Sequence, residues 1–438
     1  MAVVAEPRFD QRRFPPASRR PKLLQTVDGM RDPLGTFGAL RDAYGPVFTA
    51  RIFPFKAGLV CAADPATNQE VLTDTERFVG GDAAILLEPI VGTGSLILTP
   101  PPRHLRNRKL LLPPFHGERM KGWTAAVETI FAHGVDELPV GAPTPIRPWA
   151  QRLTLDVILR VIFGIEDPVR MATFRTALDR LTEIRMQGLL FGPAALRRDF
   201  GRRSPGGILA GRRAAVDALL IEEIERRRAA PEGDDILGIL LAARDEDGRG
   251  YSDTELRDEL KGLVLAGHET TATAIAWTVH LLAHNPAVRD RAAAGDVEYL
   301  RAVIRESMRL RAPVFDAVRI ATRDTTLGGQ PVPAGAFVSA MFCITHLDPA
   351  VWDEPHAFRP ERHLEGKPVP YAYTPFGGGV RRCIGAALAQ LELEVGLRLL
   401  SERLVPEPAG PPERCILQGV TLVPAKGGRV VFRRQVAS

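Results

Sequence analysis

Hydrophobic positions along this chain recur mainly at helical spacing, and they alternate with a period of two only in a few short stretches. The longest helical pattern covers 253–285. Ser252 and Glu255 form a capping box at its start, and the pair Asn285 and Pro286 marks its end. At 1.5 Å per residue such a helix extends roughly 50 Å. The pattern therefore predicts one helix long enough to cross a whole domain.

The rest of the pattern predicts shorter helices and a few small strands. Helices are expected over 64–80, 103–135 and 297–311, and as several pieces over 150–228, with interruptions at 192–193 and 204–207. Strands are expected as a hairpin over 46–62, over 317–343, and as a final hairpin with its turn near 427–428. No repeat and no linker divides the chain. We expect a mainly α fold with small β-sheets, consisting of a flexible tail over 1–22 and a single domain over 23–438.

Composition narrows the possible function classes without naming one. The chain has 438 residues, and its net charge of +5 comes from 57 basic and 52 acidic side chains, which does not predict nucleic-acid binding. The first 22 residues contain no long apolar run, so neither a signal peptide nor a membrane anchor is expected. Four cysteines stand far apart, at 61, 343, 383 and 415, which is typical of a reducing cytoplasm.

Cys383 stands in a setting that favours a thiolate. The segment 376–385 reads FGGGVRRCIG, and an apolar helical run over 386–400 follows it. The glycines permit a tight turn, the helix brings its positive end near the sulfur, and Arg381 and Arg382 add charge. A buried cysteine after a glycine turn is the ordinary alternative. Because no second cysteine is nearby, a zinc or redox pair is excluded, whereas a single axial haem ligand remains possible.

The spacing Phe-x-x-Gly-x-Arg-x-Cys-x-Gly resembles the haem-binding signature of the cytochrome P450 family, with every position filled. The order of the expected elements is also similar to the cytochrome P450 fold over essentially the full length. The resemblance implies haem b as cofactor, with Cys383 as the iron ligand that pushes electron density onto the metal. It places Phe376, Gly379, Arg381 and Gly385 in the loop that holds the cofactor.

A second segment, with Ala266, Gly267, Glu269 and Thr270, lies midway along the expected 253–285 helix. Taken alone, it is typical of a kinked core helix, because glycine and adjacent threonines weaken helical hydrogen bonding. Beside Cys383 it resembles the oxygen-activation segment of the family. The resemblance implies that the Thr270 hydroxyl holds the iron-bound oxygen and a water, that Glu269 relays protons, and that Ala266 and Gly267 lie against the haem.

Glu306 and Arg309 are three residues apart on one helical face, a spacing that usually gives only a surface pair. Here the pair resembles the ExxR segment of the family, and Arg362 matches the arginine that the family adds to it. The implied role is structural, as a buried ion-pair network behind the haem-thiolate loop. His363 departs from the family pattern, which usually has an aromatic residue there, and this leaves the local packing open.

The haem propionates would need cations. His104 and Arg108 are four residues apart on one helical face, and with Arg319 and Arg381 they match the positions of the family's propionate partners. Any one of them alone is equally consistent with a surface base. Further basic residues would offer a docking surface for an acidic ferredoxin, with a solvated basic face as the alternative: Arg103, Arg106, Lys109, Arg119 and Arg382.

Together these features indicate a soluble bacterial haem-thiolate monooxygenase. It would use O₂ and two electrons from separate proteins, a ferredoxin and a ferredoxin reductase. A peroxygenase of the same fold and a non-catalytic haem-binding or sensor protein are alternatives, and the Glu269–Thr270 pair argues against both. A third alternative is a helical protein without haem, which the colour of the purified protein would decide.

The substrate is expected to be a lipophilic small molecule, such as a fatty acid or a terpenoid. The segments that resemble the family's pocket are mostly aliphatic, with Asp316 as the exception: 85–87, 189–191, 314–318 and 417–420.

Overall fold

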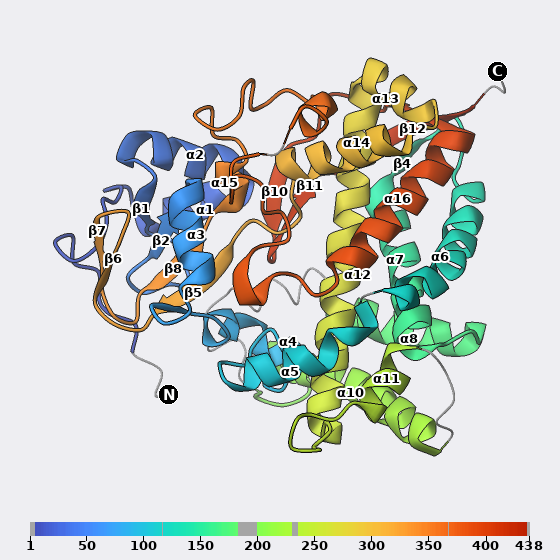
Figure 1. Cartoon of the computed structure of the whole chain (residues 1–438), viewed down its shortest axis with the longest axis horizontal. Helices are drawn as coiled ribbons and strands as arrows, with labels where there is room; N and C mark the ends of the chain where they lie inside the picture. The colour runs from blue at the N-terminus through green and yellow to red at the C-terminus, as the bar shows by residue number, and fades with distance from the viewer. Residues whose placement is uncertain (1–4, 116, 183–198, 230–234, 367, 436–438) are drawn as a thin grey trace. The chain divides into compact units, whose positions relative to one another are not determined.

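The computed structural model describes residues 5–115, 117–182, 199–229, 235–366 and 368–435 (Figure 1). The chain forms two compact units. The first unit consists of residues 1–78, 124–154 and 269–438, and the second of residues 79–123 and 155–268.

Helices dominate both units. The first unit contains α1 (Lys22–Arg31), α2 (Pro33–Tyr44), α3 (Pro65–Thr73), α13 (Pro286–Ala293), α14 (Val297–Leu310), α15 (Phe342–Thr345) and α16 (Ala386–Arg403). The second unit contains α4 (Glu88–Val91), α5 (Arg103–Leu111), α8 (Pro168–Thr182), α10 (Pro205–Ala229) and α11 (Ile236–Ala242). The chain passes from one unit to the other within α6 (Glu118–Asp136), α7 (Ile146–Phe163) and α12 (Asp253–His284). The expectation of a mainly α fold is confirmed.

The largest sheet has the strand order β1-β2-β8-β5-β3. Its strands are β1 (Val47–Ala50), β2 (Leu59–Ala62), β8 (Phe337–Ala340), β5 (Ala317–Ala321) and β3 (Phe78–Val79). β1 and β2 pair in antiparallel fashion, which confirms the predicted hairpin, and β2 pairs with β8 in parallel. In Figure 1, α3 lies across β2 and β8, and it contacts both strands.

The smaller sheets correct one prediction. β6 (Thr325–Leu327) pairs with β7 (Gln330–Val332), and β10 (Cys415–Gln418) pairs with β11 (Thr421–Pro424). The chain does turn at Gly427 and Gly428, which both have positive φ. However, β12 (Arg429–Arg434) pairs with β9 (Leu404–Pro408) and β4 (Pro143–Pro145), so the predicted final hairpin is wrong. Alternation identifies a strand, but it does not identify the strand's partner.

Prolines set several helix boundaries. The helix predicted over 103–135 is divided into α5 and α6, with Pro113 and Pro114 in the short 3₁₀ turn between them, because proline cannot donate a helical hydrogen bond. Pro205 was expected in an interruption, but it is the first residue of α10, a position that suits its fixed φ. The other predicted interruption, at 192–193, lies outside the described residues.

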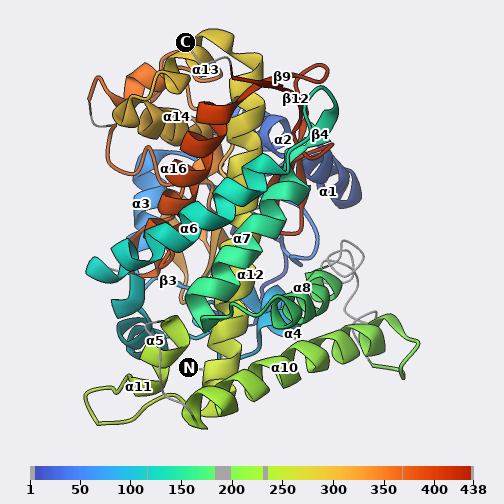
Figure 2. The same ribbon diagram turned by 90° about the vertical axis from the view of Figure 1, so that its right-hand side faces the viewer.

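α12 runs without a break from Asp253 to His284. The predicted capping box is present, since the Ser252 N–H donates to the Glu255 carboxylate (3.0 Å) and the Glu255 N–H donates to the Ser252 hydroxyl (3.3 Å). In the same unit as the second half of this helix, α16 lies beside α14 (Figure 1, Figure 2).

Part of the expected tail packs on the first unit. Phe14 is buried, and the carbonyls of Pro15 and Pro16 accept hydrogen bonds from Thr49 of β1. Among the helices that the structure describes, none combines the length and apolar character that a bilayer crossing requires.

Candidate active site

Cys383 lies on a short loop two residues before the N-cap of α16, and its side chain is exposed. Its backbone N–H donates to the carbonyl of Phe376 (2.9 Å), which closes the loop. Gly379 has φ 63°, and a Cβ there would come within 2.1 Å of the Leu72 carbonyl oxygen. Glycine is therefore required at this position, because any side chain would displace the loop from α3. The positive end of α16 lies just after the cysteine and favours the thiolate.

The other three cysteines are poorly suited to coordinate a metal ion. Cys61, Cys343 and Cys415 are all buried. Burial raises the pKa of the Cys415 thiol to about 12, and it raises the pKa of Cys61 and Cys343 well above the ordinary value. A thiol in such surroundings stays protonated. Of the four cysteines, all within the described residues, Cys383 alone is exposed.

Arg319 on β5 is a buried cation, and a bound anion would stabilise its charge. Its exposed fraction is 8%, and its Nη1 donates to the Val318 carbonyl (2.9 Å). Burial lowers the pKa of Arg319 to about 10, and the charge of Asp316 opposes this only in part. Among the described residues no carboxylate forms an ion pair with Arg319. Asp316 itself accepts a hydrogen bond from Ser339, and burial raises its pKa to about 6.

These residues fit a haem. An exposed cysteine in a glycine loop can supply an axial thiolate, and a buried arginine without a carboxylate partner can bind a propionate. Phe376, Arg381 and Gly385 belong to the same loop as Cys383, and all three are half-buried.

Glu306 is the centre of a buried polar network in the first unit. Arg309 donates to both Glu306 carboxylate oxygens (2.8 Å each), and Arg362 Nε donates to Oε1 (3.1 Å). The side chains of Glu306 and Arg309 are fully buried. Burial alone would raise the pKa of Glu306, but the hydrogen bonds from Arg309 and His363 hold it at about 2.

His363 is a member of this network that sequence reasoning missed. Its Nε2 lies 3.0 Å from Glu306 Oε2, and its side chain is almost fully buried. His363 therefore places a ring where the family usually has an aromatic residue, and it also gives the Glu306 carboxylate a polar partner. The ring also packs near Trp352 and Tyr373.

Glu269 does not lie free beside Thr270. Its carboxylate forms an ion pair with Arg147 of α7 and accepts a hydrogen bond from Gln151 (2.6 Å). Arg147 Nε also donates to the Thr273 hydroxyl (3.4 Å). The spacing of Arg147 and Gln151 by four residues places both on one face of α7, but nothing in the sequence identifies that face as the partner of Glu269.

In the second unit, Ala266 is exposed and Gly267 half-buried on α12. A Cβ at Gly267 would come within 2.6 Å of Ile158 Cδ1, so this glycine permits the close approach of two helices. His104 is buried and Arg108 half-buried, both on α5.

The basic residues expected to receive a ferredoxin are partly neutralised within the second unit. Arg103 pairs with Glu255 (3.0 Å), Arg106 with Asp245 (2.6 Å) and Lys109 with Glu246 (2.8 Å). Arg382 is exposed on the Cys383 loop of the first unit. Of the pocket segments, 189–191 lies outside the described residues.

A cysteine loop followed by a helix and a buried ExxR network are together typical of a haem-thiolate enzyme. Residues 21–430 match the model of the family described as "Cytochrome P450". The protein therefore belongs to the cytochrome P450 family, and it is an oxidoreductase of the haem-dependent monooxygenase class.

Among similar proteins, "Putative cytochrome P450 137" of Mycobacterium tuberculosis is 37% identical over 399 residues, covering 89% of this chain and 83% of its own. "Putative cytochrome P450 138" of Mycobacterium bovis is 34% identical over 449 residues, covering 99% of each chain. The structure described as "Retinoic acid bound cyanobacterial CYP120A1" superposes with a TM-score of 0.84 at 25% identity, covering 96% of this chain and 99% of that one.

Proposed function

We propose that this cytochrome P450 hydroxylates a lipophilic small molecule, a fatty acid or a terpenoid-like compound. The overall reaction is R–H + O₂ + 2e⁻ + 2H⁺ giving R–OH and H₂O. A ferredoxin and its reductase would deliver the electrons, and the cytoplasm would be the compartment. The cofactor would be haem b, and residues 23–438 would act as one cytochrome P450 domain. The observation that carries this proposal is the exposed Cys383 in its glycine loop before α16.

The haem supplies oxygen activation when bound, and the chain's own residues hold it and manage protons. Cys383 would be the iron ligand, with Phe376, Gly379 and Gly385 shaping the loop around it. The propionates would be held by Arg319 and by the sequence-matched bases Arg381, His104 and Arg108. Ala266 and Gly267 would lie against the cofactor. Glu306, Arg309 and Arg362 would keep the loop in place.

Proton delivery is assigned to Thr270 and Glu269. The half-buried Thr270 hydroxyl would hold a proton and a water near the reacting oxygen. The Glu269 carboxylate first has to leave Gln151, because that amide donates to its Oε2 in this structure. Arg147 would be the positioning residue that orients the Glu269 carboxylate, because the two form an ion pair.

The lipophilic substrate is supported by the pocket segments of the first unit. Val314, Val318 and Leu417 are partly buried against one apolar cluster. Burying an alkyl or terpene skeleton there would gain about 25 cal/mol per Å². The retinoic acid named for the cyanobacterial structure is likewise a lipophile.

A panel of fatty acids and terpenoids tests this proposal through the spin state of the haem in the purified enzyme. Compounds of one class should produce a low-spin to high-spin change, and the same compounds should yield hydroxylated products with ferredoxin, its reductase and NAD(P)H. If only small polar compounds change the spin state, the substrate proposal is wrong. If hydroxylation proceeds with hydrogen peroxide and not with the electron donors, the enzyme is a peroxygenase.

A further inference from the structure

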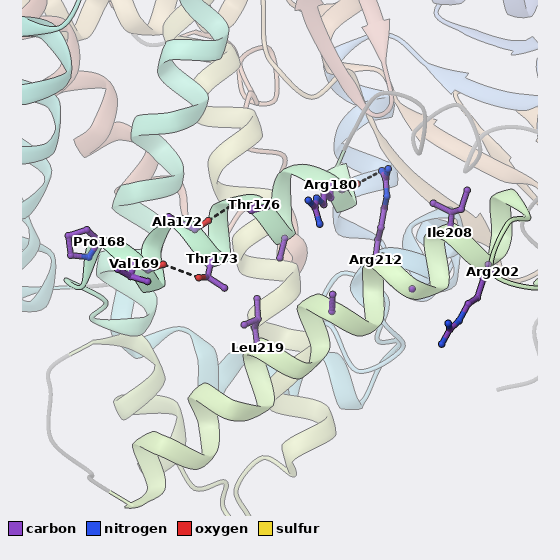
Figure 3. A pocket seen from close by; sticks show the side chains of 14 residues that line it. Pro168, Val169, Ala172, Thr173, Thr176, Arg180, Arg202, Ile208, Arg212 and Leu219 are labelled. Carbon is purple, nitrogen blue, oxygen red and sulfur yellow. Dashed lines mark hydrogen bonds between the residues drawn. The ribbon is translucent and has the colours of Figure 1, made fainter.

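A groove of about 1110 Å³ lies between α8 and α10, wholly within the second unit (Figure 3). Apolar side chains line most of it, among them Val169, Ile208 and Leu219. The volume is slightly above the range of about 300–1,000 Å³ that is usual for small-molecule sites. Nothing in the proposed hydroxylation uses this groove.

Small residues on α10 leave a depression along the wall that this helix forms. Gly207, Gly211 and Ala215 are spaced by four residues, so they share one face of the helix, and all three line the groove. A Cβ added to Gly211 would meet no other atom within 4 Å, so the groove is open at its middle. Such a furrow fits a single extended chain better than it fits a flat bilayer surface.

One end of the groove is basic. Arg180, Arg202 and Arg212 line it there, and Arg212 Nη1 donates to the Arg180 carbonyl (2.5 Å) at the C-terminal end of α8 (Figure 3). Among the described residues no carboxylate forms an ion pair with Arg180 or Arg202. Asp199 lies near Gly207, where its Oδ1 accepts the Gly201 N–H (2.8 Å). None of the described residues that line the groove is acidic.

We propose that this groove binds the anion of a long-chain fatty acid. The alkyl chain would lie along the furrow of α10, and the carboxylate would bind at Arg180 and Arg202, since guanidinium groups match carboxylates in geometry and charge. The lining of α8 extends over residues 168–180, about 18 Å at the helical rise, which suits a long acyl chain. The proposal does not rest on the proposed function, because it involves neither Cys383 nor the haem.

Equilibrium dialysis of the haem-loaded enzyme against radiolabelled palmitate, below its critical micelle concentration, tests the proposal. Gly211→Leu should weaken palmitate binding at this site by at least about tenfold, because the leucine side chain would fill the open middle of the groove. The helix itself should be preserved, since leucine has a higher helix propensity than glycine. The double variant Arg180→Gln with Arg202→Gln should weaken palmitate binding by roughly threefold to tenfold and leave the binding of methyl palmitate unchanged. Arg213→Gln is the matched control, since Arg213 neighbours Arg212 but does not line the groove.

The haem spin state is recorded in the same samples to separate this site from the substrate site. The groove variants should lose one equivalent of bound palmitate without changing the spin-state response to a known substrate. An unchanged palmitate isotherm in both groove variants would overturn the proposal. It would also be overturned if wild-type enzyme sedimented with phosphatidylglycerol vesicles and did not bind free palmitate, because the face would then be a membrane contact.

Discussion

Replacing Glu306 by alanine should destabilise the enzyme more than any surface charge change. The carboxylate accepts two hydrogen bonds from Arg309 and one from Arg362, and His363 and the Arg359 N–H also contact it. Arg309 is fully buried, so its charge cannot reach water when the carboxylate is removed. It donates to the carbonyls of His346 and Pro355 as well, and those bonds do not neutralise the charge.

Two estimates of the magnitude agree. Removing one partner of a buried ion pair typically costs roughly 3–5 kcal/mol. Independently, the pKa of Glu306 is lowered from 4.5 to about 2. At about 1.36 kcal/mol per pKa unit, this depression corresponds to roughly 3 kcal/mol of stability. Because the folded-state pKa is depressed, that stability is present above pH 4.5 and is lost as the pH falls towards 2.

The assay is equilibrium urea unfolding at neutral pH, together with the haem content per chain. Glu306→Ala should lower the free energy of unfolding by roughly 3–5 kcal/mol and yield little haem-loaded protein. Glu365→Gln is the control. Glu365 is exposed and forms a surface ion pair with Arg359 (3.4 Å), and such a pair contributes less than about 1 kcal/mol to the free energy of unfolding. If Glu306→Ala and the control unfold alike with normal haem content, the network does not stabilise the fold as argued.

Further expectations concern protons. Thr270→Ala should bind haem and substrate normally but divert electrons from NAD(P)H to hydrogen peroxide, and unchanged coupling to product would remove Thr270 from the mechanism. Arg147→Gln should lower the coupling of NAD(P)H use to product, because Glu269 loses the cation that orients its carboxylate; unchanged coupling would contradict the positioning role. Burial raises the pKa of Glu259 from 4.5 to about 7, so wild-type stability should fall by roughly 3 kcal/mol as the pH rises between these values. Glu259→Gln should make the free energy of unfolding depend less on pH in this range, which urea unfolding at several pH values measures. An equally steep fall in the variant would show that Glu259 is not the group responsible.

Local signals made much of the fold predictable. The capping box at Ser252 and Glu255 fixed the start of α12 because it acts within four residues. The partners of β12 could not be predicted, since its pairing with β9 and β4 depends on segments distant in the sequence.

The same distinction applies to the candidate site. The Cys383 loop and the Glu306–Arg309 pair are local patterns, and a single sequence displays them in full. The contact between Glu269 and Arg147 joins residues 122 positions apart, and each alone is an ordinary charged residue on a helix. His363 was noticed as a departure from the family pattern, but its contact with Glu306 requires the packed structure.

The reduced carbonyl spectrum of the enzyme tests whether Cys383 is the axial ligand of a haem. The wild-type enzyme, reduced and treated with carbon monoxide, should show the red-shifted Soret band of thiolate ligation. Cys383→Ala should lose that band completely, whereas Cys343→Ala should keep it. Retention of the thiolate band in Cys383→Ala would show that another cysteine binds the iron and that Cys383 is not the ligand.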